Sequence, residues 1–283
     1  MMLQPTGRLS RRVSLALAVP LIMCTLLTSG CESRSGQASQ ITVTGSTTIL
    51  PIAEIAGEKF SEAHPEYKVL VSGVGSSAGI ESVSRGSSDI GTASRELKDE
   101  ETDLGLVKTV IAYDAIAVIV HPSNPVDELT TEQVKDIFQG RVTNWSEVGG
   151  PDLPVGLVNR DEASGTREAF SKIVLGGEPF DPTAAILPGT GQVRSVVSQS
   201  PGAIGYISLG FVNDEVKALV IDGVEPSRET VIDGTYPIAR DLNFFTKGEP
   251  SGPAKEFIDF VLSDEIQEGV VLEAGFVPVA GGR

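Results

Sequence analysis

The apolar positions of the chain follow two spacings, one typical of strands and one typical of helices. Short apolar or β-rich runs predict strands at residues 41–44, 67–72, 89–93, 107–112, 115–120, 154–158, 203–207 and 216–221. Apolar residues at helical spacing predict helices at residues 49–62, 80–85, 130–138, 167–175, 189–200, 251–262 and 264–273. Strands that alternate with helices in this way predict an α/β protein with largely parallel sheets.

Two extended runs indicate that the chain passes twice between two lobes. The apolar run at 115–120 ends at His121 and Pro122, and a second long extended run covers residues 236–246. A chain of 283 residues that is 40% hydrophobic is long enough for two lobes with separate cores. We therefore expect residues 41–118 to form the first part of lobe 1 and residues 119–235 to form lobe 2. Residues 236–283 are expected to cross back and complete lobe 1.

The N-terminus has the pattern of a targeting segment. Three arginines precede an apolar stretch at residues 13–27, which is short for a membrane span, and small residues then lead to Cys31. The pattern resembles a bacterial lipoprotein signal, so residues 1–30 are expected to be a signal peptide and Cys31 to carry lipid. An ordinary secretory cleavage nearby is the alternative. Residues 31–40, rich in Ser, Gly, Gln and charge, are expected to be a flexible tether.

Charge and cysteine content exclude several classes of partner. The net charge of −16 becomes −19 once residues 1–30, with three arginines and no acid, are removed. Such a surface argues against nucleic acid and against anionic lipid, so we expect a membrane contact through the N-terminal lipid only. Cys31 would be the one cysteine of the mature chain, which excludes an intramolecular disulfide and a cysteine metal cluster. No cofactor or metal is expected.

A strand, a loop rich in glycine and hydroxyl side chains, and a helix start follow one another three times. The loops lie at residues 45–48, 75–79 and 160–166. The first turn of a helix has unpaired N–H groups and a partial positive charge, so it attracts anions. Arg160 adds a guanidinium, which Glu162 is expected to hold in position. A plain helix cap explains any one loop, but three together predict a site for a tetrahedral oxyanion.

Six motifs carry a resemblance to a known family. They are GSTT at 45–48, GSSAG at 75–79, DIGTASR at 89–95, RDEASGT at 160–166, PGAIGY at 201–206 and YPIAR at 236–240. In this order they resemble the phosphate-binding subunits of bacterial high-affinity phosphate ABC transporters. The resemblance implies a type II periplasmic-binding-protein fold, with two α/β lobes joined by two crossover strands. It also implies an extracytoplasmic lipoprotein that binds inorganic phosphate and passes it to ABC permease subunits. We expect a monomer that is not an enzyme.

The resemblance also implies which residues contact phosphate. By position these are Thr47, Thr48, Ser76, Ser77, Ser94, Arg95, Arg160, Ser164, Gly165 and Thr166. In the best-known members an aspartate follows the short third strand and accepts the proton of hydrogen phosphate, whereas Ser94 occupies that place here. A hydroxyl can turn and donate, so it does not repel sulfate as a carboxylate would. We therefore expect Asp161 or Glu162, the nearest carboxylates in sequence to the Arg160 loop, to supply the acceptor.

Three other functions stay open at this point. The fold also suits another tetrahedral oxyanion, such as sulfate or molybdate. A phosphate-ester hydrolase would use Ser164 as nucleophile, but His64 and His121 each precede a proline, where neither resembles a catalytic base. A surface adhesin or sensor with a vestigial site is the third alternative. We expect phosphate, with a preference over sulfate.

Overall fold

The computed structural model describes residues 38–279. The strands are β1 (Ser39–Gly45), β2 (Tyr67–Gly73), β3 (Ile90–Ala93), β4 (Leu106–Val120), β5 (Glu128–Leu129), β6 (Gly156–Arg160), β7 (Ala185–Leu187), β8 (Ala203–Ser208), β9 (Lys217–Ala218), β10 (Val220–Ile221) and β11 (Ala239–Lys247). The α-helices are α1 (Leu50–Ala63), α2 (Ser76–Ser84), α3 (Thr131–Phe138), α4 (Gly165–Phe170), α5 (Thr190–Val197), α6 (Arg228–Ile232) and α7 (Gly252–Val261). Short 3₁₀ helices are η1 (Asp99–Leu104), η2 (Trp145–Val148) and η4 (Leu209–Phe211), and π-helical turns are η3 (Ser171–Leu175) and η5 (Glu265–Val271).

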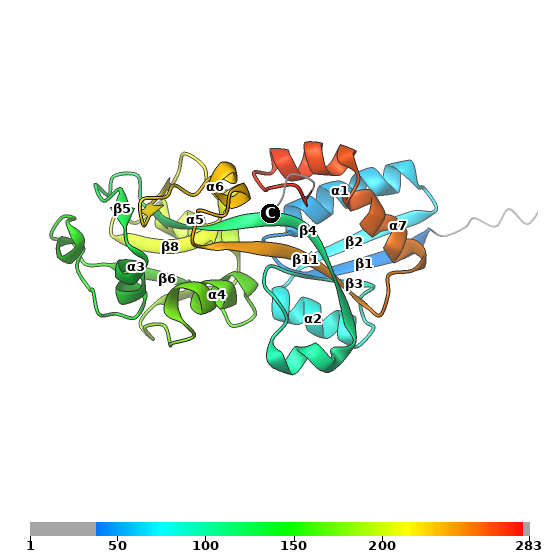
Figure 1. The fold of residues 1–283 in the computed structure, drawn as a ribbon, viewed down its shortest axis with the longest axis horizontal. Coiled ribbons are helices and arrows are strands. Elements are labelled where there is room, and N and C mark those ends of the chain that lie inside the picture. The colour runs from blue at the N-terminus through cyan, green and yellow to red at the C-terminus, as the bar shows by residue number, and fades with distance from the viewer. Residues whose placement is uncertain (1–37, 280–283) are drawn as a thin grey trace, which may run out of the picture. The chain divides into compact units, whose positions relative to one another are not determined.

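The fold is the expected two-lobed α/β arrangement, with two crossover strands shared by both lobes. The strand order is β2-β1-β3-β11-β4-β8-β6-β7, with β9 paired to β4 (Figure 1). Within each lobe the strands run parallel, β1 with β2 and β3, and β6 with β7 and β8. The crossover strands β4 and β11 run antiparallel to each other and to their neighbours. The sheet is therefore mixed, and the expected parallel order holds only within the lobes.

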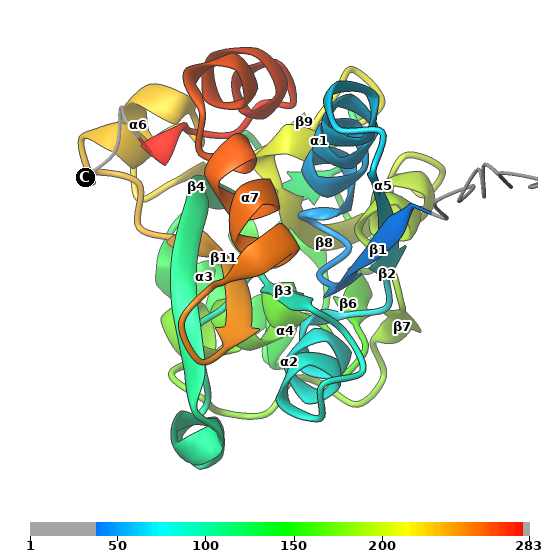
Figure 2. The ribbon, with the colours of Figure 1, turned by 90° about the vertical axis from the view of Figure 1, so that its right-hand side faces the viewer.

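Each lobe has its own hydrophobic core. In the first lobe Ile41 and Val43 of β1 pack with Phe60 of α1 and Phe257 of α7. A smaller cluster lies under α2 and includes Phe245 of β11. Figure 2 shows α1 and α7 on one face of this sheet and α2 on the other. Helices on both faces explain why all four residues of β3 are buried.

The core of the second lobe is built around aromatic side chains. Phe138, Trp145, Phe170 and Tyr206 are all buried there. Phe170 and Tyr206 stack with ring centroids 4.1 Å apart. α3 begins with the predicted cap, since the Thr130 side chain accepts from the backbone N–H three residues on. The stacked rings thus pack α4 against β8.

Strand β4 is continuous where the sequence indicates two strands. Tyr113 and Asp114 interrupt the apolar run, and that interruption predicts a break between residues 112 and 115. The structure instead keeps 15 residues in one strand, with Asp114 buried and ion-paired to Arg240. A charge that finds its partner across the sheet does not end a strand, and no local pattern reveals this partner.

The structure shifts two helix starts and one strand end toward the predicted site. α2 begins at Ser76 instead of residue 80, and α4 begins at Gly165 instead of residue 167. β6 ends at Arg160, which the sequence places in the following loop. Ser76 and Gly165 therefore lie in first helical turns.

Several expectations concern parts of the chain that this structure does not test. The signal peptide, Cys31 and most of the tether lie outside the described residues. The lobe boundaries drawn at residues 118 and 235 stay a prediction. Within residues 38–279 no helix is long and apolar enough to cross a membrane.

Candidate functional site

The predicted site residues all lie at or just after the carboxyl ends of parallel strands. From the first lobe, Thr47 and Thr48 follow β1, Ser76 and Ser77 begin α2, and Ser94 and Arg95 follow β3. From the second lobe, Arg160 ends β6, Ser164 caps α4, and Gly165 and Thr166 form its first turn. The carboxyl edge of parallel strands is where α/β proteins place ligands. The structure thus brings residues from both lobes to one place.

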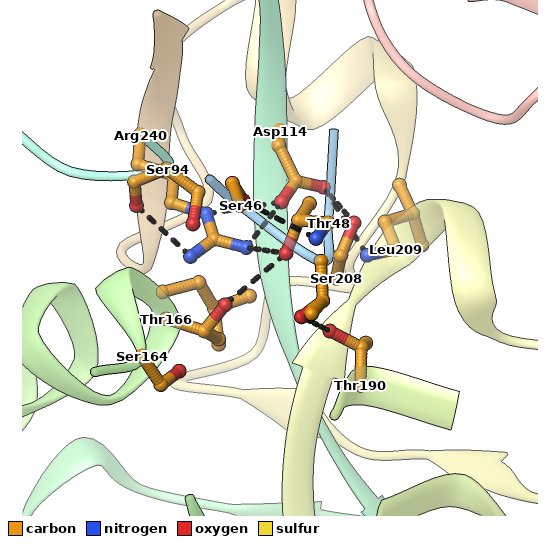
Figure 3. Close-up of polar contacts among 12 residues, drawn as sticks. Ser46, Thr48, Ser94, Asp114, Ser164, Thr166, Thr190, Ser208, Leu209 and Arg240 are labelled. Atoms are coloured by element: carbon orange, nitrogen blue, oxygen red, sulfur yellow. Dashed lines mark hydrogen bonds and ion pairs between the residues drawn. The ribbon is translucent and has the colours of Figure 1, made fainter. Parts of the chain in front are cut away.

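Hydroxyl contacts join the two lobes directly at this place. The Thr48 and Thr166 hydroxyl oxygens lie 3.2 Å apart, and Figure 3 shows the two side chains facing each other. The Thr47 and Thr190 hydroxyl oxygens also lie 3.2 Å apart. Each pair joins a loop of the first lobe to a helix start of the second lobe. Short polar side chains therefore meet where the two lobes come into contact.

Arg160 is a buried cation beside these hydroxyl pairs. Its guanidinium donates to the hydroxyls of Thr47 and Thr190 at 3.2 Å, and to the carbonyls of Pro188 at 2.8 Å and Leu187 at 3.2 Å. Only 2% of Arg160 is exposed, and no carboxylate of residues 38–279 forms an ion pair with it. Burial lowers the pKa of this guanidinium from its ordinary value. A buried charge needs a counter-charge, so this position suits an anion.

The second lobe fixes Arg160 from behind. The Asn159 side-chain oxygen accepts a hydrogen bond from the Arg160 backbone N–H at 2.8 Å and another from the Tyr206 hydroxyl. Burial raises the pKa of Tyr206, so its hydroxyl stays a donor. Phe170 stacks on the Tyr206 ring. These contacts therefore hold Arg160 in place at the end of β6.

The two candidate proton acceptors, Asp161 and Glu162, differ in their exposure to solvent. The Glu162 side chain is 94% exposed and its nearest cation is Arg167, at 3.8 Å. The expected pairing of Glu162 with Arg160 is therefore wrong. The Ser164 N–H donates to the Asp161 carbonyl, and this turn directs Glu162 outward. Asp161 instead keeps one carboxylate oxygen buried, without a hydrogen-bond partner among the described residues.

Two glycines allow the loops to approach each other. A Cβ on Gly165 would lie 2.8 Å from the Ser76 Cβ and 3.0 Å from the Ser94 hydroxyl, and closer still to the Ser76 hydroxyl. Gly75 has a φ of 100°, which side chains rarely adopt, and it packs against Ala163. Because these two glycines have no side chain, the two lobes can come into contact. The spacing of glycine and serine in the sequence does not reveal this role.

Ser76 and Ser94 form a hydroxyl pair beside Gly165. Their oxygens are 3.4 Å apart, and the Ser94 backbone N–H donates to the Ser76 oxygen at 3.2 Å. Since Ser76 accepts that N–H, its own proton is free to donate. Both residues are almost fully buried. They add donors to the site but no charge.

Arg95 already has acid partners. Its guanidinium binds both carboxylate oxygens of Glu101, at 2.6 and 2.8 Å, and lies 3.6 Å from Glu168. It also donates to the Ser77 hydroxyl at 3.3 Å. Burial works to raise the pKa of Glu101, but the hydrogen bonds and charges of Arg95 and Lys98 together outweigh it, and the pKa lies below its usual value. The role of Arg95 as an anion ligand stays a prediction.

Three residues in or beside the site were missed from the sequence. Thr190 begins α5 after β7, in a fourth copy of the strand, loop and helix pattern. Arg240 and Asp114 form a buried ion pair on the crossover strands. Burial raises the pKa of Asp114, and the Arg240 guanidinium opposes this rise. A lone acid within the apolar run of β4 indicates a buried partner, but it does not identify Arg240 as that partner.

No metal site accompanies these residues. Among residues 38–279, no three His, Cys, Asp or Glu side chains are grouped to hold a metal ion. Hydroxyls, first-turn amides and one uncompensated guanidinium are instead the groups that bind oxyanions.

Comparisons with known proteins indicate the family of this chain. A family model described as a PBP superfamily domain matches residues 32–265. The phosphate-binding protein PstS of Bacillus subtilis is 36% identical over 258 residues, covering 89% of this chain and 85% of the relative. The phosphate-binding protein PstS of Borreliella burgdorferi is 29% identical, covering 91% of this chain and 96% of the relative.

Solved structures show the same similarity. One is described as a phosphate ABC transporter substrate-binding protein from Clostridium perfringens with bound phosphate. It has a TM-score of 0.82 and 41% identity, covering 85% of this chain and 100% of that chain. An ABC-type phosphate transport receptor from Vibrio cholerae has a TM-score of 0.73 and 33% identity, with coverage of 85% and 100%.

The matches define the class of protein first, a two-lobed substrate-binding protein of the PBP superfamily. Within that class, the chain belongs to the family of the phosphate-binding subunits of bacterial phosphate ABC transporters. The family predicted from the six motifs is confirmed. The relatives are binding proteins of transporters and not enzymes, so the expectation of a non-enzyme is confirmed as well.

Proposed function

We propose that this chain captures one inorganic phosphate between its two lobes and delivers it to the permease of an ABC transporter. Arg160 supplies the positive charge. The first turns of α2 and α4 supply N–H donors through Ser76 and Gly165. Hydroxyls complete the shell, from Thr47, Thr48, Ser94, Ser164 and Thr166.

The single observation that carries this proposal is the state of Arg160. Its guanidinium is buried and meets only neutral oxygen atoms within the described chain. Of the buried guanidiniums at the site, Arg95 and Arg240 are both matched by carboxylates. A bound anion would compensate the charge that Arg160 leaves open.

A calorimetric titration of the purified protein with phosphate, sulfate and molybdate tests the ligand. We expect one phosphate per chain and weaker binding of the other two anions. Sulfate or molybdate binding more tightly than phosphate would move the assignment to another oxyanion. If none of the three anions bound, the alternative of an adhesin or sensor with a vestigial site would be favoured.

We further propose that the protein is a monomer held on the extracytoplasmic side of the membrane by lipid on Cys31. The pattern of residues 1–31 supports this anchor. Cell fractionation of the native protein and of Cys31→Ser tests it. We expect the native protein with the membranes and the variant released or unprocessed. A native protein found wholly in the soluble fraction would exclude the lipid.

A further inference from the structure

A buried ion pair lies where the two crossover strands face each other beside the site. Asp114 of β4 and Arg240 of β11 are directly opposite residues in the antiparallel pairing. The Arg240 Nε and Nη2 atoms donate to one carboxylate oxygen of Asp114, at 3.0 and 2.8 Å. Asp114 is 1% exposed and Arg240 is 5% exposed. Such a pair is costly to bury unless its remaining atoms are also bonded.

The other hydrogen bonds of the two side chains are made to residues of the two lobes. The other carboxylate oxygen of Asp114 accepts from the Ser208 hydroxyl at 2.8 Å and the Leu209 N–H at 3.2 Å, in the second lobe. Arg240 donates to the Ser94 carbonyl at 3.1 Å and to the Thr48 hydroxyl oxygen at 3.4 Å, in the first lobe (Figure 3). The pair thus touches both lobes and two of the proposed phosphate ligands.

The contact with Thr48 fixes what that hydroxyl can do. A hydroxyl has one proton to donate. Because Arg240 donates to the Thr48 oxygen, the Thr48 proton points elsewhere, toward Thr166 or the space between the lobes. Thr48 is therefore held as a donor. The hydrogen bond from Arg240 to the Ser94 carbonyl likewise holds the turn after β3 in place.

The charge of the pair also matters to the site. Burial is the main cause of the lowered pKa of Arg160, and the charge of the Arg240 guanidinium adds to this lowering. Asp114 cancels the charge of Arg240. The net positive charge that an anion meets is thus that of Arg160 alone.

We propose, on the basis of the proposed function, that Arg240 and Asp114 are positioning residues of the phosphate site. Arg240 holds the Thr48 hydroxyl as a donor, and Asp114 limits the positive charge that the anion meets. Neither residue touches the anion. They set the affinity for phosphate by holding the Thr48 hydroxyl and the Ser94 carbonyl in place and by balancing each other's charge.

The proposal predicts that phosphate affinity falls when Arg240 loses its charge but does not fall when Asp114 does. Arg240→Gln leaves the Asp114 carboxylate uncompensated, so phosphate affinity should fall about hundredfold or more. Asp114→Asn leaves the Arg240 charge uncompensated, so phosphate affinity should stay or rise, up to about tenfold, with a steeper dependence on salt. Both variants should melt at lower temperature without phosphate, since each leaves a buried charge unpaired.

Titration calorimetry with phosphate and thermal melting on the same samples test this. The variants are Arg240→Gln, Asp114→Asn and Arg240→Lys. The matched control is Asp136→Asn, whose carboxylate pairs with Arg141 at the surface at 2.6 Å. Arg240→Lys keeps the charge but loses the fork of donors, and is expected to lower affinity about tenfold. It serves as the main test if the uncharged variants do not fold.

The results separate this proposal from the proposed function. If the native protein binds phosphate, Arg240→Gln and Arg240→Lys bind it more weakly, and Asp114→Asn does not, the proposal stands. If all variants lose stability with unchanged phosphate affinity, or if Arg240→Lys binds like the native protein, the pair is structural only and the proposal fails. Failure of the native protein to bind phosphate would overturn the proposed function as well. A further experiment combines Arg240→Lys with Thr48→Val. In the Thr48→Val background, Arg240→Lys should lower phosphate affinity much less than it does in the native protein.

Discussion

At the residue scale, Gly165 is the point where the lobes leave least space. A Cβ there would overlap Ser76, which belongs to the other lobe. We expect Gly165→Ala to cost about 1–3 kcal/mol of binding free energy through overpacking, about one to two decades of phosphate affinity. The ligand-free protein should melt as before, because the overlap arises only when the lobes meet. Calorimetric titration and melting measure the two effects.

Gly191→Ala is the matched control for this variant. Gly191 also lies in a first helical turn, that of α5, and a Cβ there meets nothing within 4 Å. It should leave phosphate affinity unchanged. Equal affinities for Gly165→Ala and Gly191→Ala would show that the contact between Gly165 and Ser76 does not form in the phosphate-bound state.

Selectivity between phosphate and sulfate depends on an acceptor for the phosphate proton. The Asp161 carboxylate has a buried oxygen without a partner, whereas Glu162 points into solvent. A buried mismatch costs about 1–3 kcal/mol, so we expect Asp161→Asn to narrow the preference for phosphate. Glu162→Gln is the control and should leave the preference for phosphate over sulfate unchanged. Ser94→Ala should change this preference less than Asp161→Asn does. Competition of sulfate against bound phosphate measures this, and loss of discrimination in Ser94→Ala alone would assign the acceptor to Ser94.

The sequence predicts that some of these residues meet in the structure, but it does not predict the position of others. Arg160, Ser164 and Thr48 stand in local motifs, so their meeting could be predicted from the loops that carry them. Thr190 and Arg240 act through contacts across 143 and 192 positions of the chain, which no local pattern reveals. The outward turn of Glu162 depends on one backbone hydrogen bond, which the sequence does not reveal either.

At the element scale, α4 joins the lobes by charge as well as by hydroxyls. Glu168 of α4 lies 3.1 Å from the Lys98 ammonium and 3.6 Å from the Arg95 guanidinium, both in the first lobe. The Glu168 and Lys98 side chains are each about one-third exposed, so such a pair contributes only about 0.2–1 kcal/mol. We expect Glu168→Gln to speed phosphate release about two- to fivefold at low salt, as measured by stopped-flow dissociation.

The salt dependence and a control identify the origin of this effect. High salt screens partly exposed charges, so the difference between Glu168→Gln and the native protein should shrink as salt rises. Glu178→Gln removes a pair with Lys135 that lies within the second lobe, and it should leave release unchanged. A rate for Glu168→Gln that is faster by the same factor at all salt concentrations would argue against an electrostatic contact between lobes.

Helix and strand types were predictable where apolar spacing was clear, as in α1, α3 and α7. The start of α2 was placed too late because its first turn holds Ser76 and Ser77, which add nothing to an apolar pattern. β4 was divided in two because the partner of Asp114 lies on a distant strand. In both cases the misplaced boundary lies at the site, where polar residues replace the apolar ones that define elements.

At the scale of the whole molecule, the site residues are divided between two lobes joined by β4 and β11. Neither lobe alone holds both Thr48 and Arg160. Phosphate should therefore shift the protein toward the form in which the lobes meet, with the crossover strands as hinge. Small-angle scattering should give a smaller radius of gyration at saturating phosphate than without it. Equal values in the two conditions would contradict closure by phosphate.

The central claim is that Arg160 provides the uncompensated charge that binds phosphate. The direct measurement is the phosphate dissociation constant of the native protein, of Arg160→Ala, and of Arg141→Ala, which removes a surface guanidinium instead. A hydrogen bond to a charged group contributes about 1.5–3 kcal/mol, so Arg160→Ala should weaken binding about ten- to hundredfold or more. Arg141→Ala should bind like the native protein, and all three should melt at similar temperatures without phosphate. Native affinity in a folded Arg160→Ala variant would contradict the claim.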